Sequence, residues 1–166
     1  MRLTRRHLLA GAALLATASV TGVAASWWDQ AAGGAYVVLS DDEAAIFEAF
    51  AEAVYPAGGE PVLGARDAGV SAYLDAVLSG MIATQRDLLR LSLHAPDALP
   101  VATTGSRLRA LPVADATAII AAWLAFPNAE VRGLVQSFHI FAGMAYLTHP
   151  EVAPLIAGHF GCGYGR

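Results

Sequence analysis

A helix start at Ser40 restricts the fold of this chain more than any other feature of the sequence. Ser40-Asp41-Asp42-Glu43 has the pattern of a capping box, in which the serine side chain accepts the amide of Glu43 and the Glu43 carboxylate bonds back to the amide of Ser40. Apolar residues then recur on one side at helical spacing, at Ile46, Phe47, Phe50 and Val54. The pattern predicts an amphipathic helix that ends at Tyr55-Pro56, because proline disfavours helical geometry in the residue before it.

Four more helical segments follow, separated by proline and glycine. Helices are expected from Ser71 to Gly80, from about Met81 to His94, from Leu111-Pro112 to about Phe126, and from Asn128 to about Leu147. The stretch from Pro96 to Ser106 is expected to be a loop, since it contains two prolines and a glycine. Tyr36 to Leu39 is read as an extended lead-in rather than an edge strand. The sequence therefore predicts an all-α fold, a single small bundle of about five helices.

The first 25 residues resemble an export signal that is removed from the mature protein. A charged segment containing Arg5 and Arg6 is followed by an apolar segment that begins at Leu8 and Leu9, and small residues continue to Ala25. The paired arginines resemble the twin-arginine signal, whose route carries folded proteins. General secretory export and a retained membrane anchor are the alternatives, although glycine and hydroxyl residues dilute the apolar segment. We expect a periplasmic protein.

This division gives three regions: a signal peptide over residues 1–25, a lead-in over 26–39, and a helical domain with a glycine-rich C-terminal tail over 40–166. Without the signal, seven arginines and no lysine face fourteen acidic residues, a net charge of about −7. Binding to nucleic acid or anionic lipid calls for basic patches, so the composition argues against both.

Cofactor-binding motifs are absent from the sequence. It has no Cys-x-x-Cys, no haem attachment motif, no His-Glu-x-x-His and no Gly-x-Gly-x-x-Gly between a strand and a helix. We therefore expect no cofactor on this chain. A folded-export signal on a small chain without a cofactor favours a partner that carries one and is exported with it.

The C-terminal region holds residue types that often ligate metals or act as nucleophiles. His149, Glu151, His159 and Cys162 fit no standard metal spacing, and Pro150 and Pro154 are expected to break the helix that would align them. A nucleophile made of Cys162 with His159 or His149 lacks an evident third group. As the single cysteine of an exported chain, Cys162 is expected to be either an intermolecular disulfide or a free thiol.

The last predicted helix is apolar on both sides in its second half. Its inward stripe ends at Tyr146, while Ile140, Met144 and Leu147 face the other way. Such a helix is either central in the bundle, the reading we favour, or covered by another chain. His139, at the border of the inward stripe, is expected to be a core-edge residue rather than a ligand.

Short motifs along the whole domain resemble those of one known family. They are Leu39-Ser40-Asp41-Asp42-Glu43 at the helix start, Tyr55-Pro56 at its end, the run from Gly64 to Val70, the closing Tyr146-Leu147-Thr148-His149-Pro150 and the glycine-rich tail. Together they resemble the gluconate 2-dehydrogenase subunit 3 family. The resemblance implies a small, helical, export-signal-bearing subunit that accompanies a flavin-containing dehydrogenase of the glucose-methanol-choline type, sometimes with a cytochrome c subunit.

The resemblance supplies no catalytic residue, so we expect a non-catalytic subunit that supports the folding, stability and folded export of a catalytic subunit holding FAD. The twin-arginine translocase would be a second partner. The residues expected at the subunit interface are Ile140, Met144, Leu147, Cys162 and Tyr164. The alternative is a free-standing periplasmic protein, either a ligand-binding bundle or a hydrolase that uses His149 or Cys162.

Overall fold

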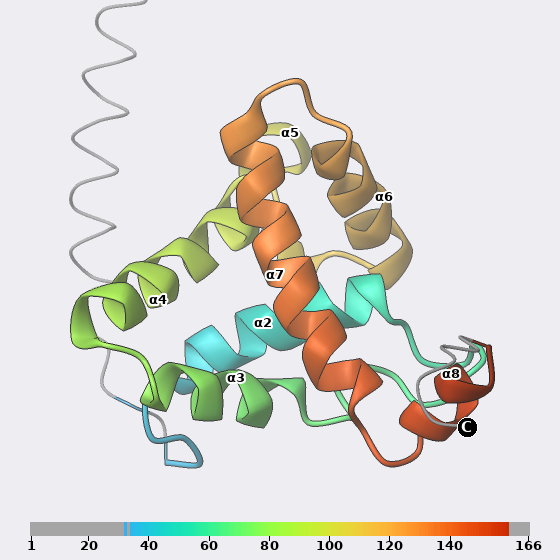
Figure 1. Ribbon diagram of the computed structural model, residues 1–166. Helices are drawn as coiled ribbons and strands as arrows, with labels where there is room; N and C mark the ends of the chain where they lie inside the picture. Colours follow the sequence, from blue (N-terminus) through green and yellow to red (C-terminus); the bar gives the residue numbers. More distant parts are fainter. Residues whose placement is uncertain (1–31, 33, 160–166) are drawn as a thin grey trace, which may run out of the picture. The chain divides into compact units, whose positions relative to one another are not determined.

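The computed structural model describes residue 32 and residues 34–159, and these form helices joined by turns, with no strand in that part of the chain (Figure 1). The helices are α2 (Asp41–Val54), α3 (Val70–Ser79), α4 (Ala83–Ala98), α5 (Val101–Thr104), the 3₁₀ turn η1 (Leu108–Ala110), α6 (Val113–Leu124), α7 (Ala129–Leu147) and α8 (Ala153–His159). The predicted all-α fold is confirmed. The signal residues Arg5, Arg6, Leu8, Leu9 and Ala25, together with Cys162 and Tyr164, lie outside the described residues.

Helix α2 is the centre of the bundle, because α3, α4, α6, α7 and η1 all pack against it. The predicted capping box opens it: Ser40 Oγ accepts the Glu43 amide at 3.1 Å, and the Glu43 carboxylate accepts the Ser40 amide at 2.8 Å. Phe47 and Phe50 are fully buried, and Phe50 meets Phe138 of α7 edge to face at 5.9 Å between ring centroids. Burying side chains of this size contributes about 1.5–3 kcal/mol each.

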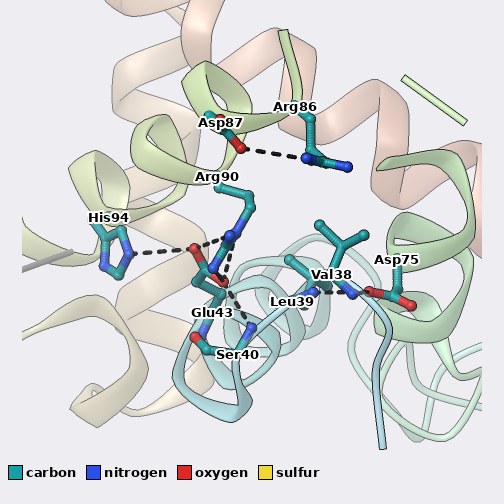
Figure 2. A network of polar contacts seen from close by, with 9 residues as sticks. All are labelled: Val38, Leu39, Ser40, Glu43, Asp75, Arg86, Asp87, Arg90 and His94. Atoms are coloured by element: carbon teal, nitrogen blue, oxygen red, sulfur yellow. Dashed lines mark hydrogen bonds and ion pairs between the residues drawn. The ribbon is translucent and has the colours of Figure 1, made fainter. Parts of the chain in front are cut away.

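The lead-in before α2 forms no strand, as predicted, but it bends at residues 37 and 38 instead of running straight. At the bend the chain passes around the carboxylate of Asp75 on α3, which accepts the amides of Val37, Val38 and Leu39 at 2.8–2.9 Å. Figure 2 shows Val38 and Leu39 beside Asp75. Burial raises the pKa of Asp75, but these three bonds outweigh it and hold the pKa below its ordinary value.

The prediction of a loop from Pro96 to Ser106 was wrong. Helix α4 continues through Pro96 to Ala98, and α5 follows at once. Pro96 lies in the last turn of α4, where its missing amide removes a single helical bond. Asp97 compensates, because its buried carboxylate accepts the Arg107 side chain at 3.2 Å and the Arg109 amide at 3.3 Å. Tertiary contacts thus stabilise a turn that the sequence pattern alone disfavours.

The break expected at Pro150 is present: α7 ends at Leu147 and Pro150 lies in the turn before α8, so no single helix carries both His149 and His159. At Pro154 the expectation of a break was wrong. Pro154 is the second residue of α8, a first-turn position where no helical partner for its amide is needed. Among the described residues, no helix is long and apolar enough to cross a membrane.

Candidate partner-binding surface

The outer face of α7 is apolar and open. Ile140, Met144 and Leu147 are 52%, 48% and 40% exposed, and their spacing places them on one side of the helix. We call these three residues the α7 stripe. The opposite side packs into the core, with Val135, Phe138, Ala142, Ala145 and Tyr146 buried. The favoured prediction that α7 is central on all sides was therefore wrong, since the bundle covers only one face of it.

The α7 stripe lies on a stretch of helix without charged residues. From Gly133 to Leu147 the sequence has no acid, arginine or lysine. Arg132, one residue before this stretch, donates to the carbonyls of Phe126 and Pro127 and so belongs to the turn between α6 and α7. On a protein with twice as many acids as arginines beyond the signal, an uncharged and apolar helix face is a distinct surface of the kind found at protein interfaces.

A hollow of about 160 Å³ lies between α2, α6 and α7. It is lined by Ala53, Val54, Thr117, Ile120, Ala121, Leu124 and His139. A second hollow, lined by Leu124, Gln136, His139 and Ile140, shares two of these residues. We call the first hollow the α6–α7 pocket. Through the second hollow it continues to Ile140 and hence to the α7 stripe.

The polar groups at the α6–α7 pocket are few and mostly engaged. The Thr117 hydroxyl lies 2.6 Å from the Ala53 carbonyl and 2.9 Å from the Val113 carbonyl, which ties α6 to α2. The half-buried His139 ring meets Tyr55 edge-on, with 6.0 Å between ring centroids. His139 thus lies at the core edge, as predicted. The pocket has apolar walls, one imidazole and no carboxylate or guanidinium in its lining.

Tyr55, the residue after α2, packs against α7 through an aromatic contact. It stacks on Tyr146 at 4.6 Å between centroids, and the Tyr146 hydroxyl donates to the Leu63 carbonyl at 2.7 Å. Burial raises the pKa of both phenols, so both remain neutral donors at physiological pH. The pair joins α7 to the loop after α2.

The run from Gly64 to Val70 has a structural role in that loop. A Cβ on Gly64 would lie 2.8 Å from both carboxylate oxygens of Glu52, and this carboxylate accepts the amides of Ala57 and Arg66 at 3.0 and 3.1 Å. Gly69, the N-cap residue just before α3, has φ +68° and so lies in the left-handed region. The motif lets the loop close tightly over the end of α2, so it positions the surface rather than providing chemistry.

A buried ionic cluster joins α4 to α2 on another side of the bundle (Figure 2). Arg90 donates from Nε at 3.0 Å to one oxygen of Glu43 and from Nη2 at 2.9 Å to the other, and His94 Nε2 lies 3.9 Å from the same carboxylate. Burial raises the pKa of Glu43, but the nearby His94 imidazole and the hydrogen bonds from Arg90 and the Ser40 amide outweigh it and lower the pKa. Neither hollow described above includes these side chains.

Sequence reasoning missed this cluster of Glu43, Arg90 and His94. The sequence features that could have indicated the ion pair are Arg90, on the predicted helix from Met81 to His94, and Glu43, the glutamate of the capping box. The bonds to the backbone and to Arg90 show that the cluster fixes the helix start.

The C-terminal candidates are not brought together among the described residues. His149 Nδ1 accepts the Glu151 amide at 3.3 Å within the turn between α7 and α8. Over the part of the chain that the structure describes, no group of three or more histidine, cysteine or acidic residues could hold a metal ion.

Comparison with known proteins places these features in a family. The family model described as gluconate 2-dehydrogenase subunit 3 matches residues 41–153, about two thirds of the chain. The chain belongs to the gluconate 2-dehydrogenase subunit 3 family. The match runs from the first residue of α2 to the first residue of α8, so it includes the α7 stripe, the α6–α7 pocket and the Gly64–Val70 motif. No curated protein matches the chain, and no solved structure does.

Proposed function

We propose that this member of the gluconate 2-dehydrogenase subunit 3 family is a non-catalytic accessory subunit that binds the FAD-containing catalytic subunit of a periplasmic dehydrogenase. The observation that carries the proposal is the family match across all of the main helices, from a family whose name denotes one subunit of a dehydrogenase. The open, uncharged α7 stripe supports it, because a subunit that works in a complex needs a surface for its partner.

The roles of the polar side chains agree with a binding subunit. Asp75, Glu52 and Thr117 bond to backbone groups and hold loops or helix ends in place. The buried Glu43 is paired with Arg90 and with its own helix start. The α6–α7 pocket is walled mainly by apolar side chains, which suits recognition of an apolar group.

Export is the second part of the proposed function. The segment from Thr4 to Ala25 resembles a twin-arginine signal, and the route that reads this signal carries proteins already folded. This chain would then engage the twin-arginine translocase and bring a bound flavoprotein with it. In that arrangement the small subunit stabilises the catalytic subunit before export and remains attached in the periplasm, where a cytochrome c subunit is a further candidate partner.

The test is an affinity purification of the processed protein from the periplasm, with a tag inserted after the exposed Gly105 so that both chain ends stay free. We expect a larger chain to co-purify with the absorbance spectrum of a flavin, and a haem band in addition would identify a cytochrome subunit. Recovery of the protein alone and colourless would contradict the proposal and favour the free-standing bundle, to be assayed for ligand binding and hydrolysis.

Cys162 is proposed to form a disulfide with the catalytic subunit, since it has no other cysteine in its own chain to pair with. The purified complex should show a band of the combined mass on a non-reducing gel, and Cys162→Ser should abolish that band. An unchanged gel pattern in the Cys162→Ser variant would leave Cys162 as a free thiol without affecting the rest of the proposed function.

A further inference from the structure

We propose that the α6–α7 pocket is the anchor site for one aromatic side chain of the catalytic subunit, and that the α7 stripe covers the uncharged apolar segment that carries this side chain. The inference rests on the proposed function, because it names the surface by which the accessory subunit holds its partner. Three observations support it: the size of the pocket, the charge of the surface beside it, and the rigidity of the walls.

The size of the pocket matches a single aromatic ring. Its volume of about 160 Å³ is close to that of engineered apolar cavities, about 150 Å³, that bind benzene. Aromatic side chains seated in such pockets supply a large share of the binding energy at protein interfaces. Because His139 adds one polar group to an otherwise apolar wall, the pocket suits an aromatic ring with or without a hydrogen-bonding tip.

The charge of the surrounding surface determines what kind of segment carries the ring. The pocket continues through Gln136 and Ile140 to the α7 stripe, and no charged residue occurs between Gly133 and Leu147. A charged partner segment placed on this face would lose its hydration without gaining a counter-charge. The stripe spans eight residues of helix, about 10 Å from the first to the last, which is enough for two turns of an apolar partner helix or a short extended segment.

The walls of the pocket are held in place before any partner binds. Ile120 and Ala53 are buried, and the Thr117 hydroxyl bridges α6 to the Ala53 carbonyl of α2. His139 is fixed against Tyr55, which is itself stacked on Tyr146. A preformed pocket binds with little loss of conformational entropy, so the anchor residue can contribute most of its burial energy to affinity.

The test compares two alanines of α6 in the full-length chain co-expressed with its catalytic subunit. Ala121 is exposed and lines the pocket, whereas its neighbour Ala122 is exposed and does not. Ala121→Phe should fill the pocket and reduce the amount of co-purified flavoprotein by about tenfold or more, in line with the loss of one anchor residue. Ala122→Phe, the matched control, should leave it unchanged. Circular dichroism and thermal unfolding should be the same for both variants.

Full recovery of the flavoprotein with Ala121→Phe would overturn this inference and leave the proposed function intact. Absence of a flavoprotein even with the unsubstituted chain would overturn the proposed function itself. A photoreactive benzoylphenylalanine at Gln136 then identifies the occupant. A cross-link to an aromatic-containing peptide of the catalytic subunit supports the inference, whereas a cross-link to residues 160–166 of this chain or to a second copy of it contradicts the inference.

Discussion

Gly143 of α7 lies directly against the hydroxyl of Tyr55, so that a Cβ at position 143 would come within 3.0 Å of the Tyr55 oxygen. Tyr55 is the residue at which α2 ends, and it also contacts His139 and Tyr146. The close approach at Gly143 therefore brings the end of α2, the loop after it and the inner face of α7 together. The position of the α7 stripe, on the outer face of the same helix, depends on this packing.

The first prediction compares two glycines of α7. Gly133 has open space where a Cβ would be, so Gly133→Ala should raise the free energy of unfolding by about 0.5–1 kcal/mol through better helix propensity. Gly143→Ala should lack this gain, because overpacking against Tyr55 costs about 1–3 kcal/mol. Urea denaturation of both variants measures the difference. Equal stabilisation by the two substitutions would mean that Tyr55 moves aside freely.

The sequence predicted the parts of the fold that depend on local signals. The capping box at Ser40 forms as expected, and a helix follows Asn128 as expected, with Asn128 Oδ1 accepting the amides of Glu130 and Val131. Prediction from local sequence failed where residues distant in the sequence determine whether a segment is helical. Asp97 stabilises the helix end at Pro96 through Arg107 and Arg109, and periodicity within one segment cannot reveal such partners.

The candidate surface was only partly predictable for the same reason. Helical spacing shows that Ile140, Met144 and Leu147 share a face, but it cannot show whether another helix covers that face. The α6–α7 pocket combines α2, α6 and α7, with lining residues from Ala53 to His139. Its existence depends on how three helices pack, which no single segment of sequence encodes.

The second prediction concerns the acid sensitivity of the lead-in. The folded-state pKa of Asp75 is lowered, so its ionised form stabilises the fold at pH values above its unfolded pKa of about 3.9, and this contribution is lost as the pH falls through the folded pKa. Asp75→Asn should cost about 1–3 kcal/mol at neutral pH, because an amide group cannot accept all three backbone bonds. Below about pH 4 the difference between the variant and the unsubstituted protein should shrink.

Unfolding measured by circular dichroism between pH 3 and pH 8 tests this dependence. Asp67→Asn is the control, since Asp67 is exposed in the loop before α3. A stability difference for Asp75→Asn that stays constant over the whole pH range would show that the carboxylate charge is not what holds the lead-in.

The third prediction compares the buried ion pair of Arg90 with the half-buried ion pair of Arg86 on the same helix. Arg90→Met leaves the Glu43 carboxylate buried without its main counter-charge and should cost about 3–5 kcal/mol. Adding Glu43→Gln should recover part of this loss, because glutamine removes the charge and still completes a capping box. Arg86→Met should change stability by less than about 1 kcal/mol, since Arg86 pairs with Asp87 near the surface.

A double-mutant cycle over Glu43 and Arg90 gives the coupling energy directly. If Arg90→Met and Glu43→Gln were simply additive, the two side chains would contribute independently, and the ionic cluster would not be what joins α4 to the start of α2.

The fourth prediction tests the export route through the paired arginines. Arg5→Lys combined with Arg6→Lys keeps the positive charge and the apolar segment of the signal, so general secretory export would tolerate it. A translocase that recognises the guanidinium pair would not, because lysine lacks the planar five-donor group of arginine. The doubly substituted chain should therefore stay in the cytoplasm, together with the flavoprotein that we propose as its partner. Fractionation followed by immunoblotting measures both chains.

The Arg2→Lys variant, altered outside the pair, serves as the control and should be exported normally. Periplasmic accumulation of the double variant would rule out the twin-arginine route, whereas loss of this subunit alone, with the flavoprotein still exported, would show that the catalytic subunit does not depend on this signal.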